Sequence, residues 1–350
     1  MTRPTGPDLF ATEQVITCRD DEVGLRAVIA IDDTTLGPGF GGVRWRPYPS
    51  TAAAVAEAQR LASAMTLKHA LAELPYGGAK SVIIADGPVP AEGSPERAAV
   101  MRRYADFLAR TAGSYIPGVD MGTLVSDMQL IREHGAPAYC ADVDPGAYTA
   151  RGVYAAMRAG VRHALGRDMA GVRVAVQGVG HVGTSLARYA ARDGAVVTVA
   201  DVDGDRAASL AHELGGTVGD PATIAESDCD VFAPCAVARV VSAGNVDRIR
   251  ARVVAGAAND TLDAPEVADL LRERGITFVP DFIANAGGVL QVHGGEVGWD
   301  DEELGRQLER IGDRVAEVLA EADEQDITPV AAALRRADRR LQDARDRSRA

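Results

Sequence analysis

The stretch that decides the fold of the second half of the chain is Val172–Gly183, which reads VRVAVQGVGHVG. It begins as an apolar strand, and a helix is predicted immediately after it, over Thr184–Arg192. Three glycines at GxGxxG spacing lie between them, and in this context the pattern indicates a dinucleotide site. Gly178 permits a tight turn, Gly180 lets the backbone approach a pyrophosphate, and Gly183 lets the helix pack closely on the strand.

Residues next to these glycines complete the predicted nucleotide site. His181 and Val182 lie where the free N–H groups and the dipole of a helix N-terminus favour phosphates. The next predicted strand, Val196–Ala200, ends at Asp201, twenty-three residues past the first glycine. An acidic side chain there can hydrogen-bond the ribose hydroxyls and repel a 2′-phosphate, which favours NAD over NADP. The alternative is that Asp201 only caps the following turn, but the register of strand, glycines, helix and acid favours the nucleotide site.

Strands and helices alternate regularly from about Arg173 onward. Short apolar runs occupy residues 172–176, 195–200, 230–233, 253–256 and 276–280. This alternation predicts a parallel sheet covered on both faces, as in a doubly wound α/β domain of the Rossmann type. Apolar residues then repeat at three- and four-residue steps over 304–319, which predicts a helix. The arginine-rich run 335–349 is interpreted as a solvated helix face or a frayed tail.

The first part of the chain has the pattern of a mixed α/β domain. Ser50 is expected to cap a long alanine-rich helix, which Pro75, Gly77 and Gly78 end. The glycine-rich segment before Ser50 is expected to be a loop, because its backbone needs unusual conformational freedom. Strands are predicted over 25–31 and 81–85, the loop over 37–42, and helices over 50–74, 95–112 and 124–134.

Composition and charge exclude several classes of protein. The chain has 47% hydrophobic and 25% charged residues, which is typical of a globular protein. Its formal charge of −13 argues against nucleic-acid or anionic-membrane partners, because both need a basic surface. It contains no apolar run long enough for a membrane span and no secretory signal, so we expect a cytoplasmic location. Four cysteines without a CxxC pair and six histidines without HxxxH or HxH spacing predict no metal site.

Two lysines, Lys68 and Lys80, lie twelve residues apart in a chain whose basic residues are otherwise mostly arginine. An ammonium can lose its proton near neutrality when it is desolvated or beside another cation, whereas a guanidinium cannot. The pair is therefore the first candidate for a general base. Lys68 shares a helix stripe with Leu61, Met65 and Ala72, and its alternative is a snorkelling lysine at a helix end. The alternative for Lys80 is a solvated lysine that begins an edge strand.

Three further polar residues lie in surroundings that suggest a ligand. Asp120 is enclosed by apolar and small residues, although it could simply cap the helix that follows. Asn259 follows a predicted strand at its carboxyl end, where open α/β sheets bind ligands. Asn285 is a second amide in glycine-rich surroundings. Either amide could be an ordinary turn former.

Taken together in this order, the motifs resemble those of the glutamate/leucine/phenylalanine/valine dehydrogenase superfamily, and most of all its leucine, valine and phenylalanine dehydrogenases. The likeness runs from about Thr17 to Val330. It is carried by Leu36-Gly37-Pro38 with Gly41-Gly42, Met65-Thr66-Leu67-Lys68, Gly77-Gly78-Ala79-Lys80, Asp120-Met121-Gly122-Thr123, Gln177-Gly178-Val179-Gly180, Phe232-Ala233-Pro234-Cys235-Ala236 and Asn285-Ala286-Gly287-Gly288-Val289.

The resemblance implies NAD-linked, reversible oxidative deamination of an L-amino acid to a 2-oxo acid and ammonia. In these enzymes the lysine matching Lys68 binds the substrate carboxylate, helped by the amide matching Asn259. The lysine matching Lys80 is the base that activates water, and the aspartate matching Asp120 handles the proton that moves to and from the amino group. A base close to a second cation in a closed site fits this chemistry.

The resemblance also implies roles for residues that the patterns alone do not assign. The threonine matching Thr149 orients the nicotinamide, and Cys235, Ala236 and Asn259 are expected at the cofactor. Gly42, Phe40 and Asn285 are expected at the substrate.

Two departures from the family pattern affect the expected substrate. Ala79 replaces a third glycine just before the base, so the backbone there is less free. Phe40 replaces a smaller residue near the substrate side chain, which predicts a small branched substrate, leucine or valine, with phenylalanine as the alternative. Because Gly39–Gly42 supplies no extra cation, although Arg44 and Arg46 are near in sequence, an apolar substrate is expected rather than glutamate.

Two other functions are weighed against this one. A non-catalytic NAD-binding regulator would have lost the lysines or the aspartate, and all three are present. A hydroxy-acid dehydrogenase would need a catalytic histidine, for which His69 is the candidate near the site, expected on the opposite side of its helix.

The expected architecture has two domains, because 350 residues exceed one ordinary core. Residues 1–144, with the C-terminal helix 323–350, are expected to form the substrate-binding and oligomerisation domain. Residues 145–322 are expected to form the NAD-binding Rossmann domain, with the active site in the cleft between the two. Relatives assemble through the first domain, so a homo-oligomer is expected.

Overall fold

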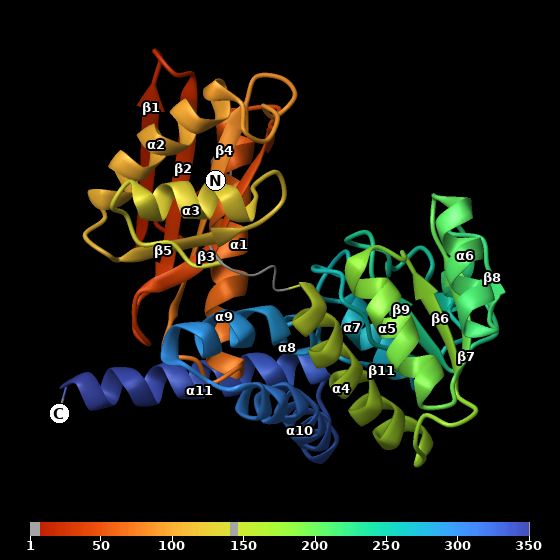
Figure 1. Cartoon of the computed structure of the whole chain (residues 1–350). Coiled ribbons are helices and arrows are strands. Elements are labelled where there is room, and N and C mark those ends of the chain that lie inside the picture. The colour runs from red at the N-terminus through yellow and green to blue at the C-terminus, as the bar shows by residue number, and fades with distance from the viewer. Residues whose placement is uncertain (1–7, 141–145, 350) are drawn as a thin grey trace. The chain divides into compact units, whose positions relative to one another are not determined.

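The computed structural model describes residues 8–140 and 146–349, and the chain forms two compact units. Unit 1 comprises residues up to 144 together with 337–350, and unit 2 comprises residues 145–336. Both are α/β, so the predicted fold class is confirmed (Figure 1). Among the described residues, no helix is long and apolar enough to cross a membrane.

Unit 1 is built on a five-stranded mixed sheet with the order β1-β2-β4-β3-β5. β2 is antiparallel to β1 and β4, whereas β3 is parallel to β4 and β5. The strands are β1 (Gln14–Asp20), β2 (Leu25–Asp33), β3 (Gly39–Pro47), β4 (Gly77–Ala85) and β5 (Tyr115–Val119).

Helices cover both faces of this sheet, because alternate residues of a strand point to opposite sides. On one face, Val28 and Val82 pack against the alanine stripe of α1 (Thr51–Leu71). On the other, Ile29 and Ile83 pack against α2 (Pro95–Ala109) and α3 (Val125–Glu133), which lie in front of the sheet in Figure 1. The predicted N-cap of α1 is confirmed, since Ser50 accepts a hydrogen bond from the Ala53 N–H.

One glycine-rich segment was predicted to be a loop, and another was predicted to end a helix. Gly39–Gly42 are the first residues of β3, and Gly77 and Gly78 are the first residues of β4. Their glycines are required by close packing rather than by chain reversal. A Cβ at Gly41 would overlap the carbonyl oxygen of Ala79 on the neighbouring strand. A Cβ at Gly78 would overlap the Thr66 hydroxyl on α1. The loop prediction is therefore wrong for residues 39–42, whereas Gly37 and Pro38 lie outside the strands and α1 ends before Gly77, as predicted.

Unit 2 contains a six-stranded sheet, entirely parallel, with the order β11-β10-β9-β6-β7-β8. Successive strands run outward from β6 in one direction and from β9 in the other, so the topological switch point lies between β6 and β9. The strands are β6 (Arg173–Gln177), β7 (Val196–Ala200), β8 (Thr217–Val218), β9 (Val231–Pro234), β10 (Val253–Val254) and β11 (Thr277–Phe278).

The helices of unit 2 alternate with these strands and extend beyond them. They are α4 (Gly146–Leu165), α5 (His181–Arg192), α6 (Gly204–Leu214), α7 (Val267–Glu273), α8 (Asp281–Ala284), α9 (Gly287–Val297) and α10 (Asp301–Gln325). The helix α4 was not predicted from the sequence. The five apolar runs all correspond to strands, some of them shorter than predicted.

The C-terminal helix α11 (Pro329–Arg349) contains the division between the units, at Ala337. This division lies later than the expected boundary at residue 323. The first turns of α11 stay with α10, since Arg336 pairs with Glu317. Further along, within unit 1, Arg340 donates to the carbonyl of Ala70 at 2.7 Å. The final run is therefore an anchored helix rather than a frayed tail.

Candidate active site

Lys68 and Lys80 are the only lysines in the chain, and both belong to unit 1. Lys68 is half-buried in the last turn of α1, and Lys80 is buried in β4, with 7% of its side chain exposed. Because β4 lies between β2 and β3, the alternative that Lys80 begins an edge strand is wrong. α1 and β4 pack against each other, so the two lysines come from adjoining elements.

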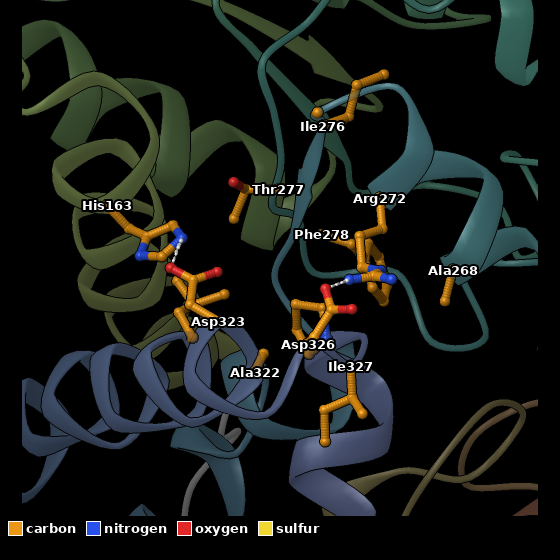
Figure 2. A pocket seen from close by; sticks show the side chains of 13 residues that line it. His163, Ala268, Arg272, Ile276, Thr277, Phe278, Ala322, Asp323, Asp326 and Ile327 are labelled. Atoms are coloured by element: carbon orange, nitrogen blue, oxygen red, sulfur yellow. Dashed lines mark hydrogen bonds and ion pairs between the residues drawn. The ribbon is translucent and has the colours of Figure 1, made fainter.

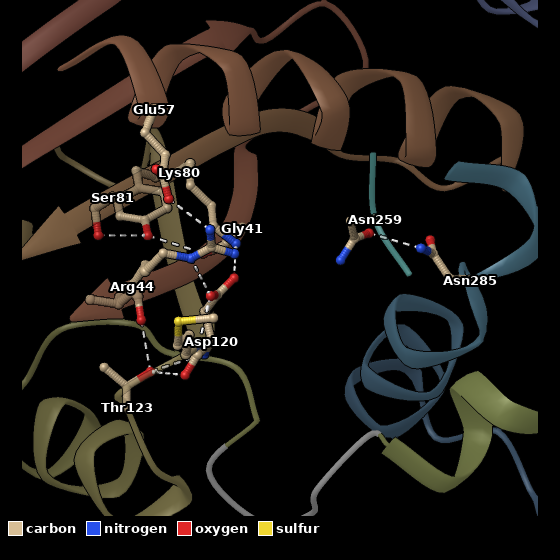
Figure 3. Close-up of polar contacts among 12 residues, drawn as sticks. Gly41, Arg44, Glu57, Lys80, Ser81, Asp120, Thr123, Asn259 and Asn285 are labelled. Atoms are coloured by element: carbon tan, nitrogen blue, oxygen red, sulfur yellow. Dashed lines mark hydrogen bonds and ion pairs between the residues drawn. The ribbon is translucent and has the colours of Figure 1, made fainter. Parts of the chain in front are cut away.

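Lys80 is paired with Asp120, a contact that the sequence did not predict (Figure 3). The ammonium Nζ donates to Oδ2 of the carboxylate. Asp120 directly follows β5 and is held by a tight turn in which its own N–H donates to the Thr123 hydroxyl at 2.9 Å. The N-cap position of α3 belongs to Leu124, so the alternative that Asp120 caps this helix is wrong.

Three residues that were not predicted to belong to the site extend this pair into a chain of alternating charges. Arg44 on β3 donates from Nε to Oδ1 of Asp120 at 2.8 Å and from Nη1 to Glu57 Oε1 at 2.7 Å. Arg46, two residues along the same strand, donates to the other Glu57 oxygen at 2.5 Å. The signal in the sequence is the spacing of Gly42, Arg44 and Arg46, which places all three on one face of a strand.

The charges of this cluster determine which groups stay ionised. Burial raises the pKa of the Asp120 carboxyl, but the neighbouring Lys80 and Arg44 outweigh burial and hold that pKa below its ordinary value. For Glu57 the balance is the same, because burial opposes ionisation whereas Arg44 and Arg46 lower the pKa. Both carboxylates are therefore anions at neutral pH.

Gly42 permits the approach of the Lys80–Asp120 pair to β3. A Cβ at this position would lie 2.7 Å from the Asp120 Cβ and 3.1 Å from the Lys80 Nζ. The backbone of Gly42 thus lies beside the Lys80 amine.

Phe40 belongs to an aromatic cluster rather than to a loop. Its ring stacks on His69 with centroids 5.3 Å apart and meets Tyr76 and Tyr139 edge-on. His69 is fully buried, and its Nδ1 lies 2.8 Å from the carbonyl oxygen of Gly77. A histidine enclosed in this way has a structural role, which argues against the hydroxy-acid dehydrogenase alternative.

In unit 2 the three motif glycines have distinct environments. Gly178 has a φ of +89°, and a Cβ there would overlap Ala236. A Cβ at Gly183 would overlap the carbonyl oxygen of Gly178, whereas Gly180 faces open space and is the N-cap of α5. His181 and Val182 form the first turn of that helix. This arrangement fits a pyrophosphate, because the N-terminus of α5 supplies backbone N–H groups and the described residues leave open space at Gly180.

Asp201 links the end of β7 to the glycine turn. Its Oδ2 accepts from the Val179 N–H at 2.8 Å, and its Oδ1 accepts from the Asp203 N–H at 2.9 Å and from Arg206 at 2.7 Å. Asp201 thus stabilises the following turn, as the alternative holds, and also contacts the glycine turn. Arg206 is a cation beside the predicted ribose contact that sequence analysis did not identify.

The two amides predicted from the sequence come together in unit 2. The Asn285 Nδ2 donates to the Asn259 Oδ1 at 2.8 Å (Figure 3). Asn285 is buried and Asn259 is exposed, so the amide nitrogen of Asn259 is available on the surface of unit 2. Thr149 lies in the first turn of α4, where Gly287 packs against its Cα.

A separate hollow of about 270 Å³ also belongs to unit 2 (Figure 2). Two ion pairs lie on its wall, His163 with Asp323 at 3.5 Å and Arg272 with Asp326 at 2.5 Å. Its other lining residues are mostly apolar, and none of the residues predicted for the substrate or cofactor lines it.

Comparisons with known proteins identify the family to which this chain is similar. Residues 12–136 match the family model described as Glu/Leu/Phe/Val dehydrogenase, dimerisation domain. Residues 144–206 and 206–349 match the model described as glutamate/leucine/phenylalanine/valine dehydrogenase. The chain is 38% identical to leucine dehydrogenase of Geobacillus stearothermophilus, over 97% of this chain and 93% of that protein. It is also 38% identical to valine dehydrogenase of Streptomyces coelicolor, over 96% and 93%.

Solved structures share the fold over nearly the whole chain. L-tryptophan dehydrogenase from Nostoc punctiforme matches with a TM-score of 0.82 and 32% identity, covering 96% of this chain and 97% of that one. Hetero-hexameric glutamate dehydrogenase from Thermus thermophilus matches with a TM-score of 0.78 and 26% identity, covering 95% and 89%.

Proposed function

Because the chain belongs to the Glu/Leu/Phe/Val dehydrogenase family, we propose leucine or valine as its preferred substrate and NAD as its cofactor. The family resemblance found in the sequence is confirmed. The protein is an amino acid dehydrogenase whose reaction is the oxidative deamination of apolar amino acids, and the family uses a nicotinamide dinucleotide.

The observation that carries the proposed mechanism is the buried Lys80–Asp120 pair beside Gly42. When bound, the nicotinamide supplies the hydride acceptor for the substrate Cα. In its neutral form Lys80 takes a proton from the water that attacks the resulting iminium carbon, and ammonia leaves after its nitrogen gains a proton and the new hydroxyl loses one. Asp120 exchanges protons with the substrate amino group. Lys68 binds the substrate carboxylate as its counter-charge, and Asn259 is its proposed helper.

The cofactor proposal rests on the glycine turn of unit 2. Gly178, Gly180 and Gly183 provide the backbone approach, and the N-terminus of α5 provides phosphate donors. Asp201 is the proposed partner of the ribose hydroxyls and disfavours a 2′-phosphate. Thr149 is the proposed contact of the nicotinamide, and Cys235 and Ala236 adjoin the turn.

The hydrogen bonds that Arg44 and Arg46 already make support a preference for a substrate with an apolar side chain. Arg44 is bound to Asp120 and Glu57, and Arg46 is bound to Glu57. A side-chain carboxylate of the substrate would have to break one of these pairs to gain a cation. Phe40 adds a rigid aromatic wall, which favours small branched side chains.

An aromatic L-amino acid is the second candidate substrate. The similarity to L-tryptophan dehydrogenase from Nostoc punctiforme favours it, and phenylalanine was the alternative from the sequence. We also propose a homo-oligomer, because the first half of the chain matches a model described as a dimerisation domain.

A spectrophotometric screen of NAD and NADP reduction over the common L-amino acids tests these proposals. We expect the highest kcat/KM with NAD and leucine or valine. A clear preference for phenylalanine or tryptophan would replace the branched-chain proposal, and equal use of NADP would overturn the role of Asp201. Absence of turnover with every amino acid would overturn the mechanism.

A further inference from the structure

We propose that Arg44 and Glu57 are positioning residues that hold the Asp120 carboxylate in one orientation and keep it ionised until it accepts a proton from the substrate. This inference rests on the proposed function of the Lys80–Asp120 pair. Four elements contribute one charge each: Glu57 on α1, Arg44 on β3, Lys80 on β4 and Asp120 after β5. The exposed fraction of these four side chains is between 7% and 16%, so water screens them weakly.

The two oxygens of Asp120 are held differently. Oδ1 accepts from the Arg44 Nε at 2.8 Å and from the Met121 N–H at 2.6 Å, and both donors are fixed by the backbone and by Glu57. Oδ2 accepts from the Lys80 amine, whose long side chain can move. The oxygen available for proton exchange is therefore Oδ2, the one that faces the proposed base.

Glu57 explains why an arginine, rather than a third lysine, occupies position 44. A guanidinium is a planar fork whose nitrogens can bind two acceptors at once. Arg44 uses Nε for Asp120 and Nη1 for Glu57, so it is anchored on both sides. A point-like ammonium could not hold both carboxylates in this geometry.

Arg44 also keeps a constant charge while Lys80 exchanges its proton. Without Arg44, Asp120 would have no cation beside it while Lys80 is a neutral amine. A buried carboxylate in that situation takes up a proton. A guanidinium cannot be deprotonated in this pH range, so Arg44 keeps Asp120 ionised and ready to accept a proton from the substrate amino group. The charged groups that contact Asp120 are Lys80 from β4 and Arg44 from β3, and Tyr115 on β5 is a buried phenol within range of its charge.

The pH dependence of kcat/KM separates this role from a purely structural one. The active form has an ionised Asp120, so loss of Arg44 raises the carboxyl pKa and moves the acid limb to higher pH. In Arg44→Gln we expect a shift of about one to three pH units. Arg44→Lys keeps the positive charge but not the forked guanidinium group. The acid limb of its kcat/KM profile should stay near that of the wild type while kcat falls.

Arg46→Gln is the matched control. Arg46 binds the same Glu57 from the same strand but does not contact Asp120 in the described contacts, so its acid limb should not move. Glu57→Gln removes the anchor and leaves the Arg44 charge, and we expect a lower kcat with a nearly unchanged acid limb. An unchanged limb in Arg44→Gln, or an equal shift in Arg46→Gln, overturns the proposal.

A second readout does not depend on activity. Because the chain has two lysines, [¹³Cε]lysine labelling gives two lysine resonances, which Lys68→Arg assigns. At a fixed pH the Lys80 resonance should move in Arg44→Gln and stay in place in Arg46→Gln. If the wild type turns over no amino acid, the proposed function fails. The lysine resonances still decide whether Arg44 interacts with the Lys80–Asp120 pair. If Arg44→Gln does not fold, Arg44→Lys and Glu57→Gln decide the role through the kcat and acid-limb outcomes above.

Discussion

The polar groups of unit 1 and unit 2 are arranged in opposite ways. In unit 2 the predicted nucleotide contacts are backbone groups at an open turn, where Gly180 faces empty space. In unit 1 the predicted chemistry depends on buried charges paired atom by atom, with Lys80 and Asp120 enclosed by Arg44 and Gly42. The contrast teaches that binding a large ligand needs space and backbone donors, whereas moving a proton needs fixed and desolvated charges. Substitutions should therefore have different consequences in the two units.

The largest expected effect is the loss of the base in unit 1. Lys80→Ala should lower kcat by about 10²–10⁴-fold, the typical contribution of a general base. Asp120 keeps Arg44 as a partner, so the fold should be maintained. Nucleotide binding by unit 2, measured by NADH fluorescence titration, should be unchanged. A variant that retains the wild-type kcat would falsify the role of Lys80.

Glycine substitutions sharpen the contrast between packed and open backbone. Gly78→Ala should lower the free energy of unfolding by about 1–3 kcal/mol or more, because the added Cβ overlaps Thr66 on α1. Gly180→Ala has open space and should change stability by less than about 0.5 kcal/mol while it weakens NAD binding. Denaturant unfolding and nucleotide titration of both variants check this, and equal destabilisation would contradict it.

A smaller effect is expected at the edge of the nucleotide site. Asp201→Ala removes hydrogen bonds to a charged group, which corresponds to a loss of about 1.5–3 kcal/mol in the binding of NAD. It also releases Arg206, which is paired with Asp201 at 2.7 Å, for a 2′-phosphate. The ratio of Kd values for NADH and NADPH should therefore move towards NADPH. The double variant with Arg206→Ala is the control and should bind both weakly.

The smallest effect is expected at the departure from the family pattern. Ala79→Gly restores the third glycine and should reduce stability by only about 0.5–1 kcal/mol, through backbone entropy. Ala79 is fully buried in β4, and its methyl group does not displace Lys80 from Asp120. We expect kcat to stay within about twofold of the wild type, which is a small effect. A large gain in kcat would show that Ala79 restrains the base.

The glycine turn of unit 2 and the strands around it could be predicted from sequence because their signals are local, although α4 and α9 were not predicted. The strand, the three glycines, the helix and Asp201 lie within about thirty residues, and periodicity alone places them. Its short strands β8, β10 and β11 were harder to delimit, since they have two residues each.

The site of unit 1 could be predicted only in part because its members are brought together by the sheet. Arg44 reaches Asp120 across 76 positions, and no periodicity encodes that pairing. The order β4-β3-β5 brings Arg44 and Asp120 into contact. This order can be predicted only if Gly39–Gly42 and Gly77–Gly78 are assigned to strands. Glycine usually signals a turn, so the sequence alone does not predict that β3, β4 and α1 approach one another closely.

The scarcity of lysine has a practical consequence for attaching this enzyme to a solid support. Aldehyde- and ester-activated resins react with the primary amines of lysine side chains, and the sequence contains two lysines, Lys68 and Lys80. Lys80 is buried, so lysine coupling would occur at Lys68, the proposed carboxylate-binding residue, where it would block the substrate. Resins that react with carboxyl groups would instead use the abundant acidic surface and leave both amines intact.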